Sequence, residues 1–226
     1  MQAFTVHCQS VGVRFRPYRT AEFAHFRNLP HGKQSEILAS FLNFYKIIVS
    51  SSEANIQTTD SRSVIWHMFS KMGWVPCSDL FDFIKNDDIV EVYDTSFHQV
   101  FRNLRFIQIC SYSFEEIVSF EWPQLFKRTE EDSGHLLETS RQLISGEIRH
   151  TVVPETGRHT IEEIFSEERR VFAGIHKCLS PIFDKNHNPI GFVGVTSAEV
   201  IATLAVIPSP SVAPENGFSG GLLASK

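Results

Sequence analysis

The sequence contains no run of about 18 uninterrupted apolar residues, the length that a membrane-spanning helix requires. Its N-terminus, MQAFTVHCQSVGVRFRPYR, places arginines after the apolar residues and lacks the continuous apolar core and small-residue cleavage site of a secretion signal. We therefore expect a cytoplasmic protein that does not use a membrane as a partner.

Cysteine is scarce, and its spacing matches no common metal or disulfide pattern. There is no C-x-x-C pair, and the ten histidines show neither H-x-x-x-H nor H-E-x-x-H spacing. We therefore expect no metal site, and we expect the cysteines to be reduced, mostly buried apolar residues. They are Cys8, Cys77, Cys110 and Cys178.

Positive charge and catalytic motifs are also lacking. The chain has 21 basic and 26 acidic residues, for a formal charge of −5, which argues against direct binding to nucleic acid. No G-x-S-x-G, phosphate loop or dinucleotide fingerprint occurs. Adjacent acidic pairs such as Glu115 and Glu116 point apart on a helix or strand, so they cannot act on one bond. We expect no enzymatic activity.

Helical patterns are present over residues 34–83, after an irregular lead-in over residues 1–33. Residues 35–51 carry apolar side chains at i, i+3 and i+4, and residues 61–74 repeat this pattern. Two such stripes must be buried against something. Either these helices fold back over the rest of the chain, or they pair with a second copy; we expect a homodimer through residues 35–72.

Residues 84–200 predict an α+β domain in which an antiparallel sheet of about five strands has its helices on one face. The stretch DIVEVYDTS alternates Ile89, Glu91 and Tyr93 with the residues between them, as a strand does. Several short helices and a longer one over residues 132–147 follow, and a final hairpin turns at DKNHNPIG. Residues 201–226 are rich in Pro, Ser and Gly and predict a disordered tail.

Four motifs in this order resemble those of PAS domains, a family of sensory and signalling domains. They are an acidic turn, N-x-x-F-x-x-x-x-S-Y-S-x-E-E-I, S-G-E at the end of the long helix, and PIFDKNHNPIGFVGV. The residues that carry the resemblance are Asp94, Asn103, Phe106, Tyr112, Ser113, Glu115, Glu116, Ile117, Ser145, Gly146, Glu147 and residues 181–195. Ser111 departs from the family, which usually has Gly there. The resemblance implies a PAS-like domain over residues 84–200, with the N-terminal helices as an extension.

The string RNLRFIQ is similar to the RNCRFLQ signature of flavin-binding LOV photoreceptors, but its position differs. In LOV domains the signature lies downstream of the Y-S-x-E-E helix start, whereas here it lies upstream of Tyr112. Leu104 stands at the cysteine position and has no thiol with which to form a flavin adduct. We therefore interpret this string as framework.

If a small molecule binds, the resemblance places it between the sheet and the short helices. Ordinary core is the simpler interpretation of the same residues, because core positions and pocket walls use the same apolar side chains. The candidate lining residues are Val92, Phe106, Tyr112, Trp122, Leu137, Phe165 and Ile175. Haem-binding PAS domains use an imidazole, commonly on the long helix, and His135 is the candidate here unless it lies on the surface. His176 falls in a predicted strand, where an inward, neutral imidazole with one partner is the usual arrangement.

The resemblance implies a sensory and protein-interaction module that relays a ligand or partner signal to an unknown effector through its flanking helices. Two alternatives stay open. One is the ligand-controlled part, or a truncated form, of a transcription regulator. The other is a haem- or flavin-dependent sensor, with the cofactor itself unknown.

Overall fold

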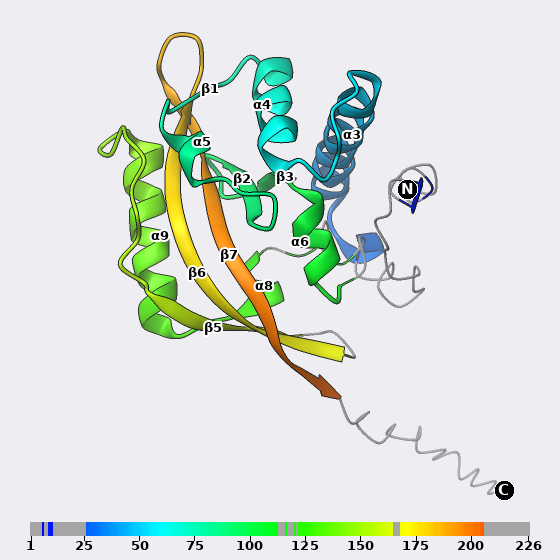
Figure 1. Cartoon of the computed structure of the whole chain (residues 1–226), viewed down its shortest axis with the longest axis vertical. Helices are drawn as coiled ribbons and strands as arrows, with labels where there is room; N and C mark the ends of the chain where they lie inside the picture. The colour runs from blue at the N-terminus through cyan, green and yellow to red at the C-terminus, as the bar shows by residue number, and fades with distance from the viewer. Residues whose placement is uncertain are drawn as a thin grey trace, which may run out of the picture.

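The computed structural model describes Val6, residues 9–10, 26–112, 116, 120, 122–164 and 168–205. It is an α+β fold in which helices surround a curled antiparallel sheet (Figure 1). The helices are α3 (His31–Glu53), α4 (Ser61–Met72), α5 (Leu80–Phe83), α6 (Leu104–Ile109), α8 (Trp122–Leu125) and α9 (Glu130–Ser145). Within the described part of the chain, every helix is too short or too polar to cross a membrane.

The sheet has seven strands in the order β3-β2-β7-β6-β5-β4, with β1 paired to β6. The strands are β1 (Val75–Pro76), β2 (Ile89–Asp94), β3 (Gln99–Arg102), β4 (Phe126–Lys127), β5 (Arg158–Glu163), β6 (Glu168–Phe183) and β7 (Pro189–Ala205). β1 and β4 contain two residues each, so the prediction of about five strands counted the longer ones only. β7 also continues past residue 200, the predicted end of the domain; residues 206–226 lie outside the described part.

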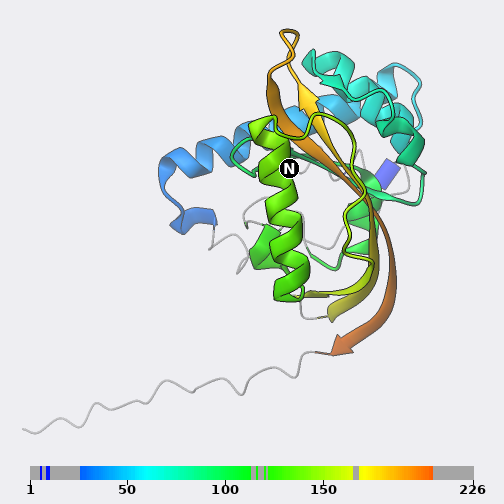
Figure 2. The same ribbon diagram turned by 90° about the vertical axis from the view of Figure 1, so that its left-hand side faces the viewer.

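The two faces of the sheet carry different residues because side chains alternate along each strand. One face, the extension face, bears Val90, Val92, Val193 and Val195, none of which is exposed to solvent. The other, the cavity face, bears Glu91, Tyr93, Phe192 and Thr196 at the intervening positions, where Tyr93 pairs with Phe192, Glu91 with Gly194 and Thr196 with Ile89. Figures 1 and 2 show α9 on one side of the β6–β7 hairpin and α3 and α4 on the other.

The N-terminal helices pack on the extension face. They therefore fold back over the rest of the chain, which is one of the two alternatives that the sequence left open. In α3 the buried residues Ile37, Phe41, Phe44 and Ile48 follow one another at helical spacing. Phe44 contacts Phe101 of β3, with ring centroids 5.1 Å apart. Burying each such side chain stabilises the fold by about 1.5–3 kcal/mol. Pairing with a second copy stays a prediction.

The helices begin and end at capping residues, some of which can be recognised in the sequence. The Asp60 carboxylate accepts from the Ser63 amide at the start of α4, and Gly73 ends that helix with a φ of 67°. Gly146 ends α9 with a φ of 79°. α9 begins at Glu130, two residues before the predicted start, because the Thr129 hydroxyl accepts from the Asp132 amide. Ser113, one of the residues that carry the PAS resemblance, lies outside the described residues.

α9 packs on the cavity face. Its Leu136 and Leu143 form a small apolar cluster with Tyr93, Leu179 and Phe192. Tyr93 and Phe192 stack with centroids 4.9 Å apart. Phe106 of α6 contacts Phe126 edge-on, at 5.9 Å, and the guanidinium of Arg102 lies 5.3 Å above the Phe106 ring. The space between these clusters holds the candidate site.

Candidate functional site

Glu91, in the middle of β2, projects from the cavity face and lines three cavities. One is a groove of about 480 Å³ between α3, β3 and α6. The other two are small: about 50 Å³ beneath α9 and about 30 Å³ beneath α6. Small-molecule sites commonly have volumes of about 300–1,000 Å³, so the groove is large enough to be one. We call Glu91, Arg102, Arg128 and His176 the Glu91 centre.

Glu91 is held by hydrogen bonds and lies among positive charges. The Tyr93 hydroxyl donates to Glu91 Oε1 at 3.1 Å, and the Gln99 amide donates to the same atom. Arg102 lies directly opposite Glu91 in the β2–β3 register. Burial raises the pKa of Glu91, and this effect outweighs Arg128, Arg102 and the two hydrogen bonds, which lower it.

The two arginines of the centre also experience the low polarity of the interior. Burial lowers the pKa of Arg102 to about 10, although Glu91 acts to raise it. Burial lowers the pKa of Arg128 as well, again against the attraction of Glu91. Charged groups are rarely kept in such a place for stability alone, because their desolvation is costly. The arrangement therefore provides fixed guanidinium donors and a carboxylate acceptor beside an apolar groove.

His176 of β6 contributes a neutral imidazole to the cavity beneath α9. Its Nδ1 lies 2.9 Å from the Thr196 hydroxyl, and its ring stacks on His159 at 5.0 Å. Within the described residues, its buried Nε2 has no hydrogen-bond partner. Burial lowers the pKa of His176 to about 3, with Arg128 and His159 adding to the effect. The ring is therefore neutral near pH 7, inward and joined to one partner, as the sequence predicted.

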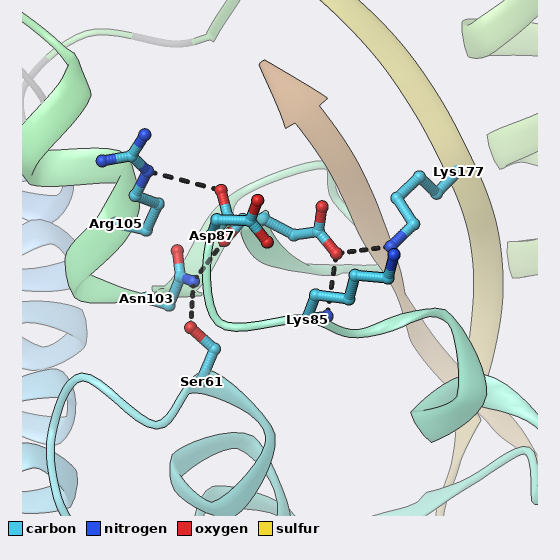
Figure 3. Close-up of polar contacts among 7 residues, drawn as sticks. Ser61, Lys85, Asp87, Asn103, Arg105 and Lys177 are labelled. Atoms are coloured by element: carbon cyan, nitrogen blue, oxygen red, sulfur yellow. Dashed lines mark hydrogen bonds and ion pairs between the residues drawn. The ribbon is translucent and has the colours of Figure 1, made fainter. Parts of the chain in front are cut away.

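A second polar group, the Asp88 joint, connects β2 to the N-terminal helices (Figure 3). We define it as Ser61, Asp88, Asn103 and Lys177. The Asn103 amide donates to Ser61 Oγ and to the Asp88 carbonyl, both at 2.8 Å. Its oxygen accepts from the amides of Val90 and Phe106, at 3.1 and 3.3 Å. All four hydrogen-bonding positions of this buried side chain are thus used.

Phe106 and Leu137 are the two predicted lining residues that the structure places at cavities of the centre. Phe106 borders the groove and the cavity beneath α6, and Leu137 borders the cavity beneath α9. Tyr112 is buried next to Phe126, and its hydroxyl donates to the Leu125 carbonyl at 2.5 Å and accepts from the Ile164 amide at 2.7 Å. Tyr112 therefore serves the packing of β4 and β5.

Val92 and Ile175 do not line the cavities of the Glu91 centre. Val92 is fully buried on the extension face, one position away from Glu91 and so on the opposite side of the sheet. Ile175 is 40% exposed. Both were chosen because they are apolar, whereas the wall of the cavity at these strands is polar. The side chain of Trp122 and all of Phe165 lie outside the described residues.

His135 does not fit the role of a haem ligand in this structure. It is exposed on α9, and its Nε2 accepts a hydrogen bond from the Glu155 amide at 3.3 Å. Among the residues that the structure describes, no three His, Cys, Asp or Glu side chains are grouped so that they could hold a metal ion.

Comparison with protein-family models and with curated proteins identifies no relative. Neither a scan against protein-family models nor a search of curated proteins gives a significant match. The PAS resemblance therefore depends on the motifs, together with an α+β fold that is compatible with it.

Sequence reasoning missed Glu91, Arg102, Arg128 and His159 as site residues. Glu91 was recognised only as one position of an alternating strand. The available signal was indirect: Glu91 stands between Val90 and Val92 in a strand whose neighbours on both sides are buried. A strand covered on both faces turns such a charge inward, where it requires partners.

Proposed function

We propose that the chain is a PAS-type sensory and protein-interaction module, in which a small molecule at the Glu91 centre changes how the flanking helices associate. The observation that carries the proposal is the placement of the half-buried Glu91 carboxylate and the buried Arg102 guanidinium at the wall of a ligand-sized groove, with Arg128 beside Glu91 in the two smaller cavities. The curled antiparallel sheet with its helices is compatible with a PAS-like fold and supports the proposal.

The groove favours a ligand with an apolar, flat body and one hydrogen-bonding end. Phenylalanines dominate its apolar wall. Glu91, Gln99 and Arg102 supply polar groups on β2 and β3, and further polar residues line the rest of the groove, namely Lys33, Glu36, Ser40, Asp94, Ser96 and His98. The phenylalanines are Phe41, Phe44, Phe97, Phe101, Phe106, Phe120 and Phe126. A ring among these side chains gains from burial and from edge-on aromatic contacts, while the polar end selects orientation.

We propose binding rather than catalysis at this centre. The Cys110 thiol borders the cavity beneath α6, but burial, followed by Glu163 and Glu91, raises its pKa well above the ordinary value. A thiol in that state is a poor nucleophile near pH 7. His176 is neutral and shares its Nδ1 with Thr196, with no serine or cysteine hydrogen-bonded to it among the described contacts.

The output surface that we propose is a second apolar stripe on α3. Leu38 and Leu42 are each 51% exposed, and the partly buried Tyr45 and Val49 continue the stripe at intervals of four, three and four residues. This is the spacing at which two helices pack side by side. We propose that it pairs with the same stripe of a second copy, within the predicted range of residues 35–72.

Native mass spectrometry of the purified full chain tests both parts in one measurement. We expect a dimer mass and an additional small-molecule mass that denaturation releases for identification. Glu91→Gln keeps the size of the side chain and removes its charge, so we expect at least about a tenfold loss of bound molecule, as hydrogen bonds to charged groups contribute about 1.5–3 kcal/mol.

The matched control is Glu36→Gln, an exposed glutamate at the rim of the same groove, which should keep the bound molecule. A chain that carries no small molecule, and gains none when incubated with a cell extract, would end the ligand-sensing proposal. A monomer at micromolar concentration would end the pairing through α3.

A further inference from the structure

The Asp88 joint lies at the point where β2, β6, α6 and α4 approach one another. Asp88 Oδ2 accepts from Lys177 Nζ at 2.6 Å and from the Lys85 amide at 2.8 Å. The Asp88 side chain is 2% exposed and the Lys177 side chain 21%, so the ion pair is largely shielded from water. In Figure 3 the Lys177 side chain reaches across from β6, and Ser61 approaches from the start of α4.

Lys177 connects this joint to the cavity beneath α9 through a bulge in β6. His176 pairs with Thr196 and Cys178 pairs with Val195, so Lys177 is an extra residue between two consecutive partners on β7. Such a bulge lets neighbouring side chains leave the strand at altered angles. It allows His176 to point into the cavity while the next residue reaches Asp88.

A short polar route therefore runs from one face of the sheet to the other. It begins at Thr196 and His176 in the cavity, passes through Lys177 to Asp88, and continues through Asn103 to Ser61 at the first residue of α4. From α4, His67 Nε2 lies 2.8 Å from the Ser50 hydroxyl of α3. The helix with the exposed apolar stripe is thereby tied to the cavity.

We propose that the Lys177–Asp88 ion pair is a positioning contact that couples the place of His176 in the cavity to the docking of α4. This inference rests on the proposed function, for which it supplies the connection between site and helices. Moving His176 shifts the bulge and weakens the ion pair. Weakening the ion pair leaves the Asp88 carboxylate without its cation. Asp88 then holds Asn103 and the Lys85 turn less firmly, because its carbonyl accepts from Asn103 and its carboxylate accepts from the Lys85 amide.

The joint is suited to this role because its partners cannot separate one at a time without penalty. A buried carboxylate that loses its ammonium partner remains charged in a poorly solvated place. A buried amide such as Asn103 that loses one acceptor keeps an unsatisfied donor. Two discrete arrangements, docked and released, are therefore favoured over a continuous drift, which is the property that coupling requires.

Hydrogen exchange of backbone amides, measured by NMR on the full chain, tests the coupling without any ligand. Thr196→Val removes the hydroxyl partner of His176 and keeps the side-chain shape. We expect exchange of the α4 amides to become about tenfold faster than in the wild type, since α4 opens locally when its docking weakens. In a Lys177→Met/Asp88→Asn background, the same Thr196→Val change should alter α4 exchange by less than about twofold.

Two further variants keep the test decisive. Thr160→Val makes the same chemical change at an exposed position of β5 and should leave α4 exchange unaltered. Ser61→Ala breaks only the last contact of the route and should also remove the response of α4 to Thr196→Val. An unchanged α4 in Thr196→Val, or an equal change in both backgrounds, would overturn the coupling. That result would leave the native mass spectrum, and with it the ligand proposal, untouched.

Discussion

The Asp88 joint and the Glu91 centre are both polar groups in the interior next to β2, yet they are built in opposite ways. In the joint, every position of the Asn103 amide has a partner, and the Asp88 carboxylate has an ammonium group beside it. In the centre, burial shifts the pKa of Glu91, Arg102, Arg128 and His176, and Nε2 of His176 has no partner among the described residues.

This difference indicates that the Asp88 joint stabilises the fold, whereas the Glu91 centre lowers its stability. Satisfied buried networks hold elements in one arrangement, whereas partly satisfied ones lower stability and are retained where a site needs them. The comparison therefore predicts that substitutions in the joint lower stability strongly. Substitutions in the centre should leave stability almost unaltered and remove binding.

Asn103→Ala should give the largest effect. It leaves the amides of Val90 and Phe106, the Asp88 carbonyl and the Ser61 hydroxyl without their partner inside the protein. We expect a loss of about 3–5 kcal/mol in the free energy of unfolding, measured by urea denaturation. Asn43→Ala, on the exposed side of α3, is the control and should change stability by less than about 0.5 kcal/mol. A loss below about 1 kcal/mol would mean that the joint does not hold the fold.

Lowering the pH should reduce the free energy of unfolding through His176 of the Glu91 centre. His176 has a pKa of about 3 in the folded state and about 6.5 when unfolded. Between these values the unfolded chain binds a proton that the folded chain does not, so stability falls as pH decreases from 6.5 toward 3. The slope from this group approaches about 1.4 kcal/mol per pH unit.

The measurement is urea denaturation at pH 7.0 and pH 5.0 for the wild type and His176→Phe. We expect the wild type to lose about 2 kcal/mol more than the variant over this range, because only the wild type gains a proton at this position on unfolding. Equal losses in the two proteins would place the imidazole in contact with water, contrary to its burial.

Much of the fold could be predicted from the sequence because its signals are local. The helical spacing of Ile37, Phe41 and Phe44, the alternation around Tyr93 and the glycine stops of α4 and α9 are all properties of neighbouring residues. The α+β class and the final hairpin follow from them. Within the hairpin turn, His187 adopts a positive φ of 62°.

The site was harder to predict because it depends on which face of β2 is covered by which helix. Apolar Val92 was expected at the cavity and charged Glu91 was not, although the two are adjacent. Because α3 and α4 cover the extension face while α6 and α9 cover the cavity face, both faces are internal and the half-buried Glu91 lies inside the protein. Likewise, the bulge at Lys177 depends on the pairing of β6 with β7, which no local pattern indicates.

The smallest expected effect gives the sharpest test of the comparison. His176→Phe/Thr196→Val replaces both members of a buried hydrogen bond by apolar side chains of similar shape and keeps a ring against His159. Exchanging both partners together is close to neutral, so we expect unfolding at pH 7.0 to change by less than about 1 kcal/mol. Thr196→Val alone leaves Nδ1 of His176 without a partner and should cost about 1–2 kcal/mol. The double variant should nevertheless bind the small molecule more weakly, because it alters the cavity beneath α9, where His176 and Thr196 lie beside Glu91. A double variant that is as strongly destabilised as Asn103→Ala would show that the centre, like the joint, belongs to the framework of the fold.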